Sequence, residues 1–148
     1  MNVRPQTAFD LLQAFARAEF AMKGVVGLCG GAEGAKASAN WEAFIRRVEA
    51  ALPARPDLDR QARNLLFAEP PSVEVVRHGI AVFEPRPLAG TEGRRLIEAA
   101  RRIRNNLFHG GKEAIEARPG RDEALVLAAL HVIQTAVRCD VDVALRFV

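Results

Sequence analysis

The stretch TEGRRLIEAARRIRNNLF, residues 91–108, predicts the helix on which the fold depends. Its apolar side chains recur at steps of three and four residues and so mark one helical face. They are Leu96, Ala100, Ile103 and Leu107. The stretch HGG follows at once, and a glycine just beyond a last turn often takes the left-handed conformation that ends a helix. A helix with one apolar face needs partner elements that cover it.

Similar apolar spacing predicts four more helices, over residues 7–24, 41–52, 57–68 and 121–139. The last of these is apolar around much of its circumference, which places it at the centre of the protein or at a subunit interface. We therefore predict an all-α, single-domain bundle of about five helices spanning residues 1–148.

Two segments interrupt the helical pattern. Residues 24–40 are rich in glycine and small polar residues, so we expect a loop there. Residues 72–87, SVEVVRHGIAVFEPRP, are β-branched in places but contain one glycine and two prolines. That composition favours a long loop, or at most one small hairpin, before the helix at residues 91–108.

Composition limits the functional classes. The chain has 148 residues, 49% of them hydrophobic, and a formal net charge of +3, which is too small by itself to indicate nucleic-acid binding. We see neither a secretory signal nor an apolar run long enough to span a bilayer, and expect a cytoplasmic protein without membrane contact. Cys29 and Cys139 are far apart without metal-type spacing, so we expect reduced thiols, no metal site and no cofactor.

Positive charge is concentrated between residues 94 and 112. Six cations lie there beside one acid, Glu98: Arg94, Arg95, Arg101, Arg102, Arg104 and Lys112. A concentrated basic surface suits the phosphates of RNA or DNA. The alternative is that these arginines solvate the outer face of a helix, where cations near the C-terminus also complement the helix dipole.

The stretch RNNLFHGGK, residues 104–112, has two possible explanations. His109 and the glycines after it work as an ordinary helix stop. That explanation accounts less well for Arg104 and the paired asparagines, because asparagine is a poor helix former. In a regular helix Arg104 and His109 would be rotated by about 140° and separated by about 7.5 Å, so they converge only if the helix breaks near His109.

These residues resemble the HEPN superfamily, whose motif is an arginine followed four to six residues later by a histidine. The sequence IRNNLFHGGK carries the resemblance, with the helical pattern and the early AEFAMKG stretch in support. The resemblance implies a homodimeric helical bundle and, in many members, a metal-independent endoribonuclease, sometimes a toxin paired with a cognate antitoxin. Arg104 and His109 match the catalytic positions and Asn105 the polar third residue. Gly111 stands where some toxin members have a tyrosine that is modified.

Metal-free RNA cleavage needs a base, an acid and a cation, which histidine and arginine can supply. One chain offers one motif histidine, because His78 lies in an irregular segment and His131 in a very apolar helix where a structural role is expected. A symmetric dimer would bring two copies of the motif together. Arg101, Arg102 and Lys112 are candidate contacts to the RNA backbone.

We therefore expect an RNA-cleaving toxin or stress factor that leaves 2′,3′-cyclic phosphate ends. Two alternatives stay open. One is an inactive module that binds RNA, a nucleotide or a partner protein through the same groove, and the other is a helical adaptor in which HGG is only a cap.

Overall fold

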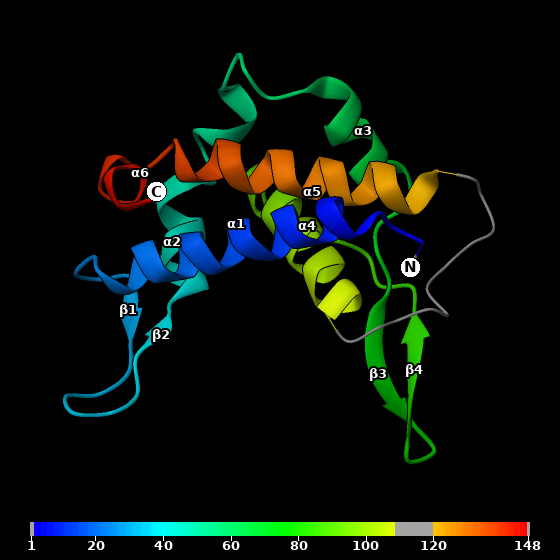
Figure 1. The fold of residues 1–148 in the computed structure, drawn as a ribbon, viewed down its shortest axis with the longest axis horizontal. Helices are drawn as coiled ribbons and strands as arrows, with labels where there is room; N and C mark the ends of the chain where they lie inside the picture. The colour runs from blue at the N-terminus through cyan, green and yellow to red at the C-terminus, as the bar shows by residue number, and fades with distance from the viewer. Residues whose placement is uncertain (1, 109–119, 148) are drawn as a thin grey trace.

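The structure, a computed structural model, describes residues 2–108 and 120–147 (Figure 1). Within these residues the chain forms six α-helices, one 3-10 helix and two antiparallel two-stranded sheets. The prediction of an all-α fold is therefore wrong, and the protein is of mixed α/β class. Both sheets are hairpins that project from the helical body (Figure 1).

Three long helices form the centre of the protein. They are α1 (Pro5–Lys23), α4 (Glu92–Phe108) and α5 (Arg121–Val137). Helix α5 packs against both of the others, and α1 and α4 also touch one another. Buried side chains from all three helices, such as Phe15, Ile97 and Ile133, join in one hydrophobic core. The apolar circumference of α5 thus reflects a central position.

The shorter helices surround this centre. They are α2 (Trp41–Val48), the 3-10 helix η1 (Leu52–Ala54), α3 (Arg60–Ala68) and α6 (Val141–Arg146). The helix predicted over residues 41–52 is split into α2 and η1. The sequence prediction missed α6, although Asp140 is a favourable N-cap whose side chain accepts from the backbone N–H of Asp142 and of Val143.

The hairpin before α4 consists of β3 (Val73–Arg77) and β4 (Ile80–Glu84). Two residues connect the strands, and both have positive φ: 52° at His78 and 79° at Gly79. Two-residue hairpin turns favour this left-handed pair because it matches the twist of the strands. The two prolines of the segment follow β4 and leave the hairpin hydrogen bonds intact. Of the two predicted possibilities for residues 72–87, the small hairpin is correct.

A second, much shorter hairpin was not predicted. Strands β1 (Cys29–Gly30) and β2 (Ser38–Ala39) pair across the glycine-rich segment that was expected to be a loop. Gly31 and Gly34 have φ of +113° and +81°, so glycine permits the sharp reversal of the chain between them. Local periodicity could not indicate strands only two residues long.

Gly93 fixes the start of α4 against the end of α2. This glycine is buried, and a Cβ atom in its place would overlap the backbone of Glu49. Thr91 supports the same contact, since its hydroxyl donates to Glu49 Oε1 at 2.8 Å and accepts from the backbone N–H of Arg94. The direction of α4, and so the position of its last turns, depends on this close approach.

Candidate functional site

The last turns of α4 present arginines on the side that faces α1. Arg101 and Arg104 are three residues apart and therefore lie on one helical face. The guanidinium of Arg104 lies 5.0 Å from the ring centre of Phe15 in α1, and that of Arg101 lies 5.1 Å from the ring centre of Trp41 in α2. Both distances are within the range of a cation–π interaction. The two aromatic rings hold the two cations side by side, and we call Arg101 and Arg104 the arginine pair.

Two carboxylates lie near the arginine pair but do not accept hydrogen bonds from all of its N–H donors. Glu19 accepts a hydrogen bond from Trp41 Nε1 at 3.2 Å, while its other oxygen is 4.0 Å from Arg104 Nη1. Arg101 Nη1 donates to Glu98 at 3.0 Å, one turn back on α4. The carboxylate of Glu19 is thus shared between a tryptophan and an arginine, and its contact with Arg104 is too long for a hydrogen bond.

Both guanidinium groups of the arginine pair retain unused donors. The Nε atoms of Arg101 and Arg104 are buried without a hydrogen-bond partner, while the side chains as a whole are 29% and 24% exposed. An unsatisfied buried N–H group is costly, and an arginine has five N–H donors suited to phosphate or carboxylate. The pair therefore combines fixed aromatic support, partial solvent access and free hydrogen-bonding capacity.

The opposite side of α4 faces the β3–β4 hairpin and is organised differently. Arg102 Nη1 donates to the carbonyls of Pro71 at 3.1 Å and Arg86 at 2.5 Å, and Nη2 donates to that of Pro87 at 3.2 Å. Burial lowers the pKa of Arg102 below its usual value, since desolvation disfavours the charged form. Arg102 thus ties both ends of the hairpin to α4. The contact of Arg102 with RNA stays a prediction, and RNA would compete with these carbonyl groups for the same N–H donors.

The paired asparagines have separate environments. Asn105 is exposed and, with Arg102, lines a cavity of about 220 Å³ beside β3. Asn106 is buried, and its Nδ2 donates to the carbonyl of Ser72 at 3.1 Å. The sequence motif indicated a role for Asn105 and none for Asn106. The signal was available, because Asn106 follows Ile103 by three residues and so falls on the apolar face of α4.

The predicted site residues are only partly brought together. Arg101 and Arg104 lie beside each other toward α1, whereas Arg102 and Asn105 lie beside each other toward the hairpin. His109 and Lys112 fall outside the described residues. The convergence of Arg104 with His109 stays a prediction, and Asn105 is on a different side of α4 from the arginine pair.

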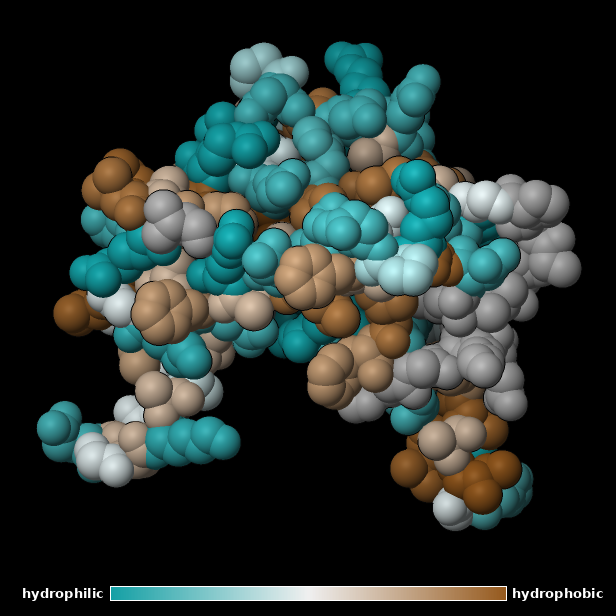
Figure 2. Space-filling model, in the orientation of Figure 1, coloured by the Kyte–Doolittle hydropathy of each residue, from teal (hydrophilic) through white to brown (hydrophobic). Residues whose placement is uncertain are grey.

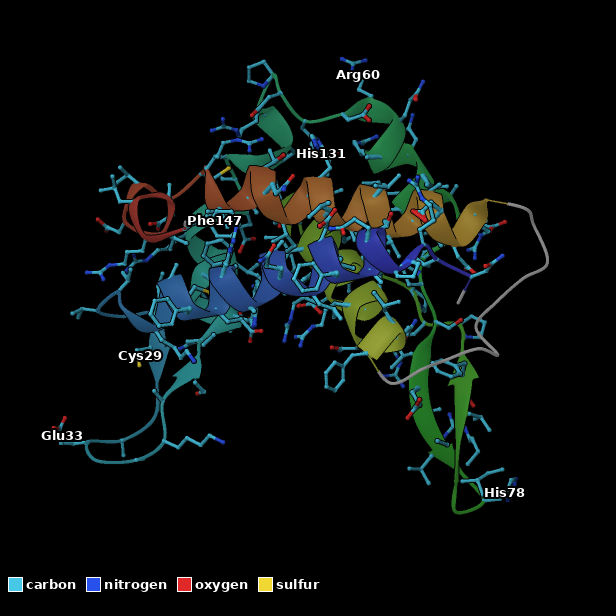
Figure 3. The ribbon with its side chains drawn as sticks, viewed as in Figure 1. Cys29, Glu33, Arg60, His78, His131 and Phe147 are labelled. Atoms are coloured by element: carbon cyan, nitrogen blue, oxygen red, sulfur yellow. The ribbon has the colours of Figure 1, made fainter. Side chains whose placement is uncertain are left out.

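The two described histidines are distant from this end of α4. His78 lies at the tip of the β3–β4 hairpin, and His131 projects from α5 (Figure 3). His131 Nε2 accepts a hydrogen bond from the backbone N–H of Asp59 at 2.8 Å, which ties α5 to the start of α3. This contact gives His131 the structural role that its apolar surroundings had predicted.

Comparisons of the chain with protein-family models, with curated proteins and with solved structures found no match. The resemblance to the HEPN superfamily therefore rests on the sequence motif. Of the helices in residues 2–108 and 120–147, none has the length and apolar character needed to cross a membrane. The same residues contain no group of three or more His, Cys, Asp or Glu side chains placed to hold a metal ion.

Proposed function

We propose that this protein binds RNA at the arginine pair and is a metal-independent endoribonuclease of HEPN type. The observation that supports the proposal best is the state of Arg104. Its guanidinium is held over Phe15, its Nε is buried without a partner, and its side chain is 24% exposed. A phosphate oxygen would bind the exposed N–H donors of Arg104, and Arg101 beside it would contact the next phosphate or the same one.

In the proposed reaction the 2′-hydroxyl oxygen attacks the adjacent phosphorus and the bond from phosphorus to the 5′-oxygen breaks. A base removes the 2′-hydroxyl proton and an acid protonates the leaving 5′-oxygen, so the products carry a 2′,3′-cyclic phosphate and a 5′-hydroxyl. Arg104 stabilises the charge that gathers on the phosphate oxygens. His109 is the proton-transferring group that the sequence offers.

A homodimer belongs to the proposal, since one chain contributes one motif histidine. Exposed aromatic side chains on α1 support a second copy: Phe9 is 56% exposed and Phe20 is 73% exposed. On the face that carries α1, apolar residues stand among hydrophilic ones (Figure 2). Large exposed aromatic side chains of this kind are available for contact with a partner surface. A twofold axis near α1 would bring two arginine pairs toward a common cleft.

The second candidate is an inactive RNA-binding or protein-interaction module, and Glu19 favours it. A carboxylate that already lies 4.0 Å from Arg104 competes with a phosphate for the guanidinium and weakens transition-state stabilisation. In such a module the same arginines would bind phosphates without cleavage.

One experiment separates these functions. Purified full-length protein is incubated with labelled single-stranded RNA in EDTA, and cleavage and binding are compared for wild type, Arg104→Ala and His109→Ala. Arg46→Ala is the matched control, because Arg46 is an exposed arginine of α2 whose ion pair, within residues 2–108 and 120–147, is with Glu42 of its own helix. Cleavage that is lost in both motif variants and kept in the control supports the nuclease.

Other results would redirect the proposal. Binding that requires Arg104 without any cleavage supports the inactive module. Unchanged binding and cleavage in Arg104→Ala and His109→Ala would overturn both candidates and favour an adaptor whose HGG is a helix cap. Light scattering tests the dimer, and a monomer that persists at micromolar concentration would contradict a shared site.

A further inference from the structure

A second cavity lies on the side of α4 away from the arginine pair. It has a volume of about 290 Å³ and is bounded by the end of α4, the start of α5, and the segments before β3 and after β4. This size is near the lower end of the range for small-molecule sites. Its apolar walls come from three prolines and two aliphatic residues: Pro70, Pro71, Pro85, Ile103 and Leu125. Such walls suit a small planar ring.

Asp122 lines this cavity and carries an unpaired acceptor. The residue is only 4% exposed, and its Oδ2 accepts from the backbone N–H of Asn2 at 2.8 Å. Its Oδ1 is buried without a hydrogen-bond partner. The position of Asp122 in the first turn of α5 explains why a carboxylate is stable there, since it opposes the helix dipole. It does not explain the unpaired oxygen, which an N–H donor from a ligand would satisfy.

Arg121 brings donors to the same cavity. Its Nε donates to Glu69 at 2.9 Å, and the side chain is 14% exposed. That single bond leaves the Nη groups of a largely buried guanidinium for another acceptor. The lining of the cavity thus combines a cationic donor, an anionic acceptor and apolar walls.

We propose that this cavity is a binding site for a guanine base, supplied either by a free guanine nucleotide or by a guanosine within an RNA strand. The guanine edge carries the O6 acceptor beside the N1–H and N2–H donors. Arg121 would donate to O6 and Asp122 Oδ1 would accept from N1–H or N2–H. Adenine carries an amino group in place of O6 and an acceptor at N1, so each of these contacts would meet a group of the wrong kind.

The adjoining cavity provides space for the rest of the nucleotide. Ser72 and Asn106 line both cavities, and the adjoining cavity of about 220 Å³ extends to the exposed Asn105. The guanine site does not require nuclease chemistry and is separate from the arginine pair. Its failure and the failure of the proposed function are therefore distinguishable, because Arg104→Ala should weaken binding of every RNA strand but leave the preference for guanine over adenine unchanged.

The test uses full-length protein in two arms. In the first, calorimetry compares GMP with AMP. In the second, fluorescence anisotropy compares labelled oligouridine strands that contain one central guanosine or one central adenosine. We expect guanine to bind about tenfold tighter than adenine or more in at least one arm, in line with the discrimination of a well-placed pair of hydrogen bonds. Preference in the first arm identifies a free nucleotide as a ligand, and preference in the second arm alone identifies a residue of RNA.

The variants address the two polar groups. Asp122→Asn replaces the free acceptor with a donor and should reduce the guanine preference to about twofold or less. Glu123→Gln is the matched control: Glu123 is the next residue, loses the same charge and also accepts from the N-terminal segment, through Arg4, but does not line the cavity. Arg121→Met is a second test if Asp122→Asn does not fold, and it should also remove the preference. Equal binding of guanine and adenine by wild type in both arms, or an unchanged preference in a folded Asp122→Asn or Arg121→Met variant, would overturn the proposal.

Discussion

The two sides of α4 use the same residue type in opposite ways. Toward the hairpin, Arg102 donates to three backbone carbonyls and its charge is partly desolvated. Toward α1, Arg104 rests on an aromatic ring, has one distant carboxylate and keeps an unpaired Nε. Arg102 and Arg104, two positions apart in sequence, therefore differ in how many of their N–H donors form hydrogen bonds within the protein. Arg102 uses its donors to stabilise the structure, whereas Arg104 keeps donors that a ligand can use.

The largest effect is expected where both sides of α4 can be disturbed at once, at Gly93. Gly93→Ala inserts a methyl group into the backbone of Glu49, so α4 must shift or its start must unfold. We expect the free energy of unfolding to fall by about 3 kcal/mol, at the upper end of the usual cost of overpacking. Chemical denaturation measures it.

Gly34→Ala is the control for that substitution. A Cβ atom added at Gly34 would meet no atom within 4 Å, and only the φ of +81° opposes a side chain there. Left-handed strain costs about 1–2 kcal/mol, so the control should be the milder variant. A milder effect at Gly93 would show that α4 is not fixed by this contact.

The difference between the two arginines predicts the next largest effect. Arg102→Ala leaves three carbonyl groups without their donor, and we expect a loss of about 2 kcal/mol in the free energy of unfolding. Hydrogen exchange should accelerate in β3 and β4, because Arg102 holds both ends of that hairpin. Unchanged exchange in the two strands would contradict the structural role.

Arg104→Ala should have a smaller effect on stability than Arg102→Ala. The cation–π contact with Phe15 contributes about 0.5–1 kcal/mol, and the contact with Glu19 is a long, partly exposed ion pair. Denaturation of the two variants side by side tests the comparison directly. A loss at Arg104 equal to that at Arg102 would mean that Arg104 is a structural residue, and its proposed contact with RNA would lose its main support.

The sequence predicted the long helices well because each has a strong apolar period. The segments predicted over residues 91–108 and 7–24 agree with α4 and α1 to within a few residues. It failed at β1 and β2, whose two-residue pairing has no periodic signal, and at α6, where only the cap at Asp140 marked the helix. The wrong fold class follows from these short elements and from the β3–β4 segment, where one glycine and two prolines left a loop and a small hairpin as the two possibilities.

The sequence predicted which residues belong to the candidate site but not how their side chains are placed relative to one another. Spacing of three along α4 already places Arg101 with Arg104. Nothing in the sequence indicates that the rings of Trp41 and Phe15 hold the two guanidinium groups, or that Glu19 accepts a hydrogen bond from Trp41. These contacts join residues far apart in the chain. The different roles of Arg102 and Asn105 likewise depend on where the hairpin returns to α4.

A third arginine of α4 extends the comparison to pH. Arg94 donates to both oxygens of Glu42 at 2.8 Å, and this hydrogen bond is the main cause that lowers the pKa of Glu42 from its usual 4.5. A carboxyl group whose pKa is lower in the folded state stabilises the protein above about pH 4.5 and loses this contribution as the pH falls below that value. We therefore expect the melting temperature of wild type to fall between pH 5 and pH 3 by more than that of Glu42→Gln, which has no carboxyl group to protonate there. The difference should be small because both partners are partly exposed, and parallel melting curves for the two proteins would mean that pairing with Arg94 adds nothing to stability.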